Sequence, residues 1–101
     1  ELATLAQHRL PVTVLVVDDG GYGMLRYDQR HAGDAEQGVD LSTPDFVALA
    51  QAFGVEARTV RDVRSDLGPA LAEAARSGGP RLLVLRCSML PPRTTSPRWN
   101  D

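Results

Sequence analysis

Apolar positions along the chain follow two periodicities, one typical of helices and one of buried strands. Apolar residues at spacings of three and four predict a helix over residues 1–10, which Pro11 ends. Residues 12–17 form an almost unbroken apolar, β-branched run, typical of a strand buried on both faces of a parallel sheet. No capping residue precedes the first helical pattern, so we expect Glu1 to lie at a cut inside or just before a helix.

The middle of the chain contains a clear helix signature. An amphipathic turn is expected over residues 22–30, followed by a polar, exposed loop over residues 31–41. Thr43 is the expected cap of the next helix, and Gly54 is its expected end. The apolar positions predict that this helix has a buried face made of Phe46, Leu49, Ala50 and Phe53.

The remaining pattern completes an alternation of helices and strands. A strand is expected over residues 55–60, a helix from residues 65–69 to about 78, and a last strand over residues 81–87. Such an order predicts an α/β fold, in which a parallel sheet with right-handed crossovers is flanked by helices. We expect one domain over residues 1–90 and an extended, proline-rich tail over residues 91–101.

Composition narrows the class of protein. With 43% apolar residues, 24% charged residues and a net charge of −2, the chain is typical of a soluble globular domain. It has no basic cluster that would favour nucleic acid and no apolar stretch long enough to span a membrane. The single cysteine, Cys87, cannot form an internal disulfide, and a buried thiol favours a cytoplasmic location.

The first strand ends in an acidic, glycine-rich turn. Asp18 and Asp19 lead into Gly20-Gly21-Tyr22-Gly23, and ligands of open α/β sheets bind beyond the carboxyl ends of strands. Carboxylates suit magnesium, and glycines allow the backbone to approach a phosphate closely. Asp and Gly are also the usual residues of a plain turn, so the residues alone leave both interpretations open.

Residues 14–19 resemble the opening strand of a response-regulator receiver, where paired acids bind magnesium beside a phosphoacceptor aspartate. That family also has a lysine on a late strand. All eleven cationic residues of this chain are arginines, which argues against a receiver.

A longer resemblance covers residues 1 to about 88. Glu1-Leu2-Ala3-Thr4, then Leu10-Pro11-Val12, then the strand and Asp18-Asp19-Gly20-Gly21-Tyr22-Gly23-Met24 resemble the second half of the cofactor motif of acetolactate-synthase-like thiamine diphosphate enzymes. The string from Pro44 to Val55 is similar to the helix that follows in that family. The resemblance implies a thiamine-diphosphate-binding, doubly wound domain that is incomplete at its N-terminal side.

The resemblance also implies roles for individual residues. Asp19 takes the place of an asparagine whose side chain ligates Mg²⁺, and Gly21 takes the place of a residue whose main-chain carbonyl is another ligand. Tyr22, Gly23 and Met24 fall where the family's loop lies along thiamine diphosphate. No catalytic residue is expected in this chain, because the glutamate that activates the cofactor lies in another domain of the family.

The chain departs from the family where Asp18-Asp19 replaces two asparagines. Asp19 remains a sound magnesium ligand, whereas Asp18 either points away and caps the following turn or marks a site that is altered or lost. The resemblance implies part of an enzyme that decarboxylates or carboligates 2-oxo acids, partnered by its remaining domains and by further subunits of a homo-oligomer. The alternative is a degenerate, non-catalytic binding or assembly module of the same fold.

Overall fold

The computed structural model describes residues 1–90 and divides the chain into two compact units. Unit 1 comprises Glu1–Asp18 and Thr43–Cys87, and the described part of unit 2 comprises Asp19–Ser42 and residues 88–90. The predicted tail over residues 91–101 lies outside the described residues. Over residues 1–90, no helix has both the length and the apolar character that crossing a membrane requires.

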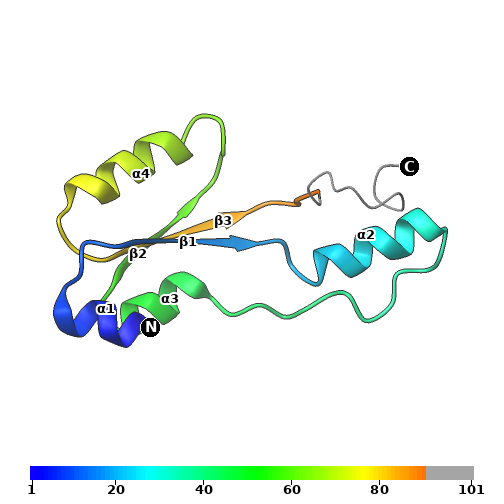
Figure 1. Ribbon diagram of the computed structural model, residues 1–101, viewed down its shortest axis with the longest axis horizontal. Coiled ribbons are helices and arrows are strands. Elements are labelled where there is room, and N and C mark those ends of the chain that lie inside the picture. The colour runs from blue at the N-terminus through cyan, green and yellow to red at the C-terminus, as the bar shows by residue number, and fades with distance from the viewer. Residues whose placement is uncertain (91–101) are drawn as a thin grey trace, which may run out of the picture. The chain divides into compact units, whose positions relative to one another are not determined.

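Unit 1 contains a three-stranded parallel sheet (Figure 1). The strands are β1 (Thr13–Asp18), β2 (Glu56–Val60) and β3 (Arg81–Arg86), in the spatial order β1-β3-β2. Both pairings are parallel, with Thr13 and Glu56 each opposite Arg81. This arrangement confirms the predicted α/β fold with a parallel sheet.

The central strand β3 supplies the core of both faces of the sheet. Leu82 and Val84 pack on one face, while Leu83 and Leu85 pack on the other, and all four are buried. This alternation follows from the two-residue period of a strand. A central parallel strand is therefore apolar at every interior position, as the run over residues 81–87 indicated.

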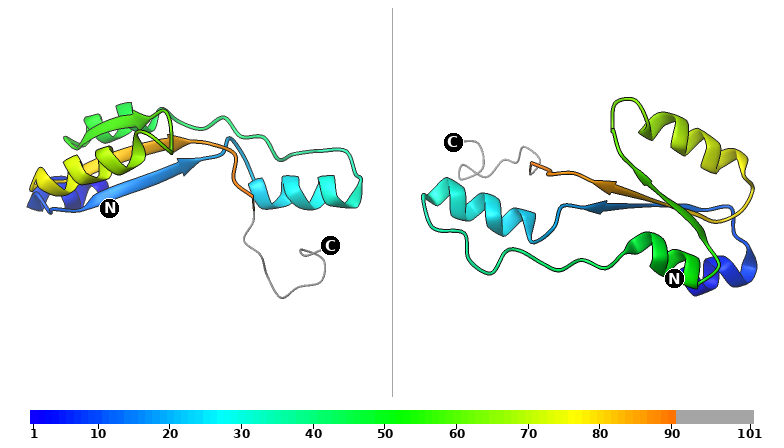
Figure 2. Two further views of the ribbon diagram at one scale, coloured as in Figure 1. Left: turned by 90° about the horizontal axis from the view of Figure 1, so that it is seen from above. Right: turned by 180° about the vertical axis from the view of Figure 1, so that it is seen from behind.

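Helices cover both faces of the sheet (Figure 2). The helices α1 (Leu2–His8) and α3 (Phe46–Ala52) pack on the face of Leu82 and Val84. The helix α4 (Leu67–Arg76) packs on the face of Leu83 and Leu85 through Ala70 and Leu67. The predicted doubly wound arrangement is present in unit 1.

The N-cap of α3 differs from the sequence prediction. Asp45, not Thr43, caps the helix, because the Asp45 carboxylate accepts a hydrogen bond of 3.0 Å from the backbone N–H of Ala48. Thr43 lies two residues earlier and donates its hydroxyl elsewhere, to Asp18. The predicted cap was wrong because a cap and a long-range hydrogen bond use the same residue types.

The buried face of α3 is also narrower than its apolar pattern predicted. Ala50 is fully buried, and Phe46 and Val47 pack against the same cluster. Leu49 and Phe53 were predicted to be buried, but they are 41% and 45% exposed. The short helix meets the sheet along one stripe, and these two side chains face away from it.

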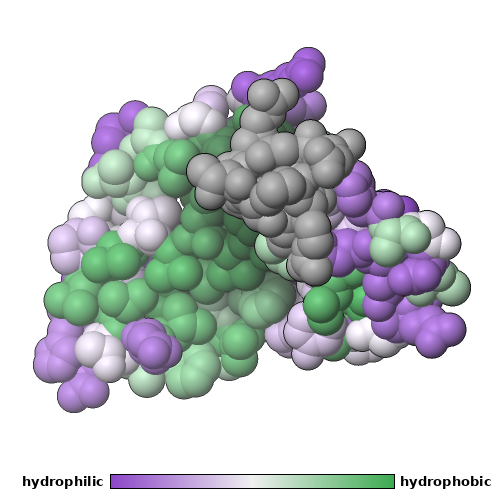
Figure 3. Space-filling model, turned by 45° about the vertical axis from the view of Figure 1, so that its right-hand side comes forward, coloured by the Kyte–Doolittle hydropathy of each residue, from purple (hydrophilic) through white to green (hydrophobic). Residues whose placement is uncertain are grey.

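The strand β1 lies at an edge of the described sheet and is not buried on both faces. Leu15 and Val17 are each 40% exposed, although their register places them opposite the buried Leu83 and Leu85. The strand was predicted to be interior, but the buried cluster that α4 forms on this face includes residues of β2 and β3 and none of β1. Figure 3 shows hydrophobic side chains gathered on the surface of the sheet-bearing unit.

Unit 2 is built around the helix α2 (Gly23–Ala32), close to the amphipathic turn predicted over residues 22–30. Gly33 ends it in the left-handed conformation, with a φ of 78°. The chain then returns alongside the start of the helix, with Gly21 and Asp40 forming an antiparallel bridge. The returning segment is exposed as predicted, except for Val39, which is 2% exposed.

The exposed edge generates a first prediction. The 101-residue chain, produced alone, should self-associate, because an unpaired apolar strand edge is a template for pairing with another chain. Leu15→Lys should shift the particle mass measured by light scattering toward that of a monomer. The control is Leu49→Lys, which places the same charge at an equally exposed leucine on α3 and should leave association unchanged. Equal effects of the two variants would contradict an edge-driven mechanism.

Candidate functional site

The two aspartates at the end of β1 line different clefts. Asp18 lines a cleft of about 350 Å³ in unit 1, and Asp19 lines a cleft of about 320 Å³ in unit 2. Successive side chains of a strand point to opposite sides, so neighbouring residues at a strand end readily face different surroundings. The two carboxylates therefore do not form one paired acidic site.

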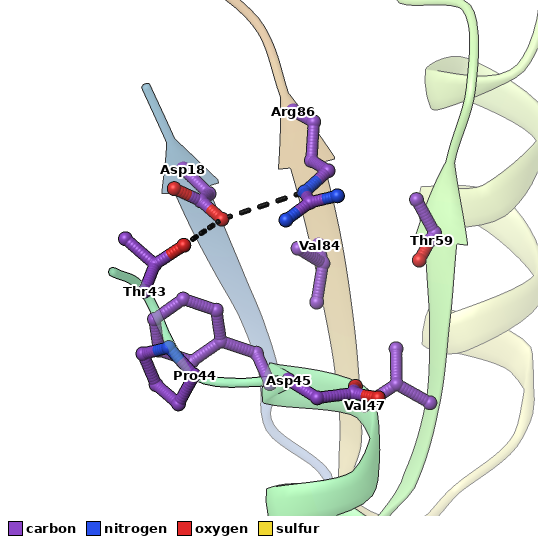
Figure 4. A pocket seen from close by; sticks show the side chains of 9 residues that line it. Asp18, Thr43, Pro44, Asp45, Val47, Thr59, Val84 and Arg86 are labelled. Atoms are coloured by element: carbon purple, nitrogen blue, oxygen red, sulfur yellow. Dashed lines mark hydrogen bonds and ion pairs between the residues drawn. The ribbon is translucent and has the colours of Figure 1, made fainter. Parts of the chain in front are cut away.

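The Asp18 carboxylate is buried and held by two partners within unit 1 (Figure 4). Its side chain is 3% exposed, and its Oδ2 accepts a hydrogen bond of 3.0 Å from the Thr43 hydroxyl. Arg86 Nε lies 3.5 Å from the same oxygen, on a side chain that is 69% exposed. A buried carboxylate is costly unless it is hydrogen-bonded and paired with a cation, and these two groups satisfy both needs. Both of these partners of the Asp18 carboxylate belong to unit 1.

The Asp19 carboxylate instead contacts the backbone of the glycine-rich segment that follows it. Its Oδ1 accepts a hydrogen bond of 3.3 Å from the backbone N–H of Gly21, in the manner of an Asx turn. Its Oδ2 lies against Gly23, where a Cβ would collide with it. A glycine at position 23 therefore leaves room for this carboxylate at the start of α2.

Gly21 occupies the tightest position in the turn. A Cβ at this position would collide with the carbonyl oxygen of Val39 and the guanidinium of Arg26. Two backbone hydrogen bonds flank it, from Tyr22 N–H to the Val39 carbonyl at 2.7 Å and from Leu41 N–H to the Gly20 carbonyl at 3.0 Å. The close approach of residues 39–41 explains why a glycine stands here.

Arg26 joins the turn to the returning segment of unit 2. Its guanidinium donates to the main-chain carbonyl of Asp19 at 3.4 Å and to the Asp40 carboxylate at 2.8 Å, and it lies 3.7 Å from Glu36. The neighbouring Arg30 pairs with Glu36, which raises the pKa of Arg30 through its hydrogen bond and charge. Sequence reasoning missed Arg26, because its partners lie 7 to 14 residues away with no periodic signal.

The structure brings together some of the predicted cofactor-binding residues. Asp19, Gly21 and Gly23 contact one another through the turn. Tyr22 and Met24 are 52% and 48% exposed, and neither lines the cleft in which Asp19 and Gly23 lie. A contact of these two side chains with thiamine diphosphate stays a prediction.

The turn offers oxygen atoms of the kind that Mg²⁺ binds. Within residues 1–90, Asp19 Oδ2 and the Gly21 carbonyl take part in no hydrogen bond, so both keep lone pairs available. The described residues contain no cluster of three or more His, Cys, Asp or Glu side chains able to hold a metal. Because Mg²⁺ takes about six oxygen ligands, the turn fits one part of a magnesium site.

Comparisons with known proteins identify the family of the chain. The model of the thiamine pyrophosphate enzyme C-terminal, TPP-binding domain matches residues 1–85. The acetolactate synthase large subunit of Parasynechococcus marenigrum (strain WH8102) is 40% identical over 90 residues, and that of Porphyra purpurea is 34% identical over 86 residues. Each alignment covers 82% of this chain and 14% of the relative.

A solved structure agrees with the sequence relatives. The thiamine diphosphate-dependent 4-hydroxybenzoylformate decarboxylase of Rhodococcus jostii RHA1 matches with a TM-score of 0.74 and 29% identity, over 88% of this chain and 17% of that one. The chain spans about a sixth or less of the length of these proteins. The match over residues 1–85, the parallel sheet and the turn after β1 together show that the chain belongs to the family of C-terminal, thiamine pyrophosphate-binding domains of thiamine pyrophosphate enzymes.

Proposed function

We propose that this chain forms one part of the thiamine diphosphate site of an enzyme that decarboxylates or carboligates 2-oxo acids. The observation that carries the proposal is the turn after β1, which presents Asp19 Oδ2 and the Gly21 carbonyl inside a domain of the thiamine pyrophosphate-binding family. One solved relative is named for decarboxylation of a 2-oxo acid, and several sequence relatives are named for synthesis of acetolactate. These names support the reaction class.

In this proposal, the Asp19 carboxylate and the Gly21 carbonyl would hold Mg²⁺, and the metal would supply positive charge to bind the diphosphate of the cofactor. A carboxylate is an acceptor-only, charged ligand, so Asp19 binds a hard cation at least as well as an amide would. Thiamine diphosphate supplies the electron sink for the charge that develops when a 2-oxo acid loses carbon dioxide. The contribution of this chain is to anchor and orient that group, and no described residue is assigned a proton-transfer role.

The proposed reaction also needs further domains of the same enzyme and contact with a second subunit. The chain covers only 14% of the acetolactate synthase large subunits that it matches, so further domains supply the remaining ligands and the substrate pocket. The exposed apolar residues of β1 support contact with such a domain or with a second subunit of a homo-oligomer. We place the enzyme in the cytoplasm, where the lone Cys87 stays reduced.

The assignment of the metal ligand can be tested by comparing the two aspartates in the complete enzyme. Asp19→Ala removes a ligand, so the Kd for thiamine diphosphate at fixed Mg²⁺ should rise by more than the roughly 10- to 100-fold that loss of a ligand-supporting group costs. Asp18→Ala should cause the smaller loss, because Asp18 faces Thr43 and Arg86. Asp34→Ala, at an exposed acid of unit 2, is the control. Equal losses at positions 18 and 19 in a calorimetric titration would refute the assignment.

A further test concerns the close approach at Gly21. Gly21→Val should weaken magnesium-dependent cofactor binding by roughly tenfold or more, because its side chain would push the Val39 backbone and Arg26 away from the turn. Circular dichroism should stay close to that of the unmodified protein, because the sheet lies in unit 1. Gly68→Val is a matched control, since a Cβ there meets open space. Unchanged affinity of the Gly21 variant would contradict the model of the turn.

The isolated chain should bind the cofactor poorly. It offers two candidate oxygen ligands within residues 1–90, and Mg²⁺ needs about six, so calorimetry with thiamine diphosphate and Mg²⁺ should detect no binding in the micromolar range. The matched positive control is the complete enzyme under identical conditions. Micromolar binding by the isolated chain would show that most of the site lies within it.

A further inference from the structure

Asp18 lies where the chain passes between the two units. The chain leaves unit 1 after Asp18, re-enters it at Thr43 and leaves it again after Cys87. Asp18 contacts the chain at both other crossing points. Its carboxylate accepts from the Thr43 hydroxyl at 3.0 Å, and its main-chain carbonyl accepts from the Cys87 N–H at 3.3 Å.

The hydrogen bond between Asp18 and Thr43 closes a large loop. The two residues are 25 positions apart, and the residues between them are those that carry Asp19, Gly21 and α2. Joining the two ends of a long segment lowers the number of conformations that the segment can adopt. The bond between Asp18 and Thr43 therefore restricts the conformations of residues 19–42. A buried carboxylate is well suited to the role, because losing a hydrogen bond costs a buried charged group more than it costs a group that water can solvate.

Arg86 holds the Asp18 carboxylate more weakly than Thr43 does. Its Nε lies 3.5 Å from Asp18 Oδ2, at the end of β3, but its side chain is 69% exposed. Ion pairs of exposed cations contribute little, because water screens them. The arrangement therefore depends first on the Thr43 hydroxyl and second on the Arg86 charge.

We propose that Asp18 is a positioning residue for the cofactor turn: by holding Thr43, Cys87 and Arg86, it fixes the chain crossings that flank the turn and so keeps Asp19 in place for the metal. The part of this inference that concerns Mg²⁺ rests on the proposed function. The part that concerns anchoring stands on the contacts within unit 1 alone. The carboxylate at position 18, where the family resemblance implies an amide, is paired with Arg86, and Asp18 is not among the residues that line the cleft of Asp19.

The test compares two isosteric substitutions in the complete enzyme. Thr43→Val removes the hydroxyl that Asp18 accepts, whereas Thr59→Val makes the same change in a residue that lines the same cleft from β2, beyond β3 (Figure 4). Amide hydrogen exchange without cofactor should become about tenfold faster over residues 19–23 and 38–43 in Thr43→Val and should stay unchanged in Thr59→Val. Thr43→Ser retains a hydroxyl and should restore the slow exchange.

A second variant, Arg86→Gln, tests the same role if Thr43→Val fails to fold. Arg86→Gln removes the charge of a side chain that is 69% exposed and leaves the Thr43 hydrogen bond to Asp18 in place, so it should accelerate exchange over the same residues by only about twofold. Cofactor binding gives an independent readout. In Thr43→Val the Kd for thiamine diphosphate at fixed Mg²⁺ should rise about tenfold, while kcat at saturating cofactor stays at the unmodified value, because no reacting group has changed.

The outcomes separate the two proposals. Equal exchange in Thr43→Val and Thr59→Val, or a fall in kcat with no change in Kd, would overturn the positioning role of Asp18. Faster exchange in Thr43→Val, in an enzyme that binds no thiamine diphosphate in its unmodified form, would support the anchoring role and overturn the proposed function.

Discussion

The structure depends on the central position of β3. This strand pairs in parallel with β1 on one side and with β2 on the other, and its interior residues alternate between the two hydrophobic clusters. Every helix of unit 1 packs against a face that β3 helps to form. Because parallel strands end at the same edge of a sheet, this pairing also brings Asp18 and Arg86 together, in register, at the carboxyl ends of β1 and β3.

The two neighbouring carboxylates at the end of β1, Asp18 and Asp19, differ in the charged groups that surround them. The Asp18 carboxylate is hydrogen-bonded and ion-paired within unit 1. One oxygen of the Asp19 carboxylate, in contrast, has no hydrogen bond among the described residues. Arg26 holds the main-chain carbonyl of Asp19 and leaves its carboxylate unpaired with any cation of residues 1–90. A carboxylate that is held in place by its backbone and not neutralised by an arginine suits a cation-binding role.

Much of the fold could be predicted from periodicity, because a parallel sheet buries long apolar runs that stand out in a sequence. The runs that became β1, β2 and β3 were each placed within about one residue of their ends, and the family resemblance was confirmed over residues 1–85. The failures involve information that is not local. Thr43 has the composition of a cap but its hydroxyl serves a residue 25 positions earlier, and the exposure of Leu49 depends on what packs beside it. Arg26 could not be recognised, since its role is defined by a segment that folds back onto it.

The return of residues 39–41 along the turn has a consequence for how the family can vary in length. Backbone hydrogen bonds fix residues 39–41 against Gly20 and Tyr22, and Gln37 is bound to Gln29 on α2. By contrast, the segment from Gly33 and Asp34 to Glu36 is exposed and makes few hydrogen bonds. We therefore expect added or removed residues to be tolerated around residues 33–35, just beyond α2, whereas a single residue added near Val39 would shift the register of the bridge between Gly21 and Asp40 and displace the backbone at Gly21.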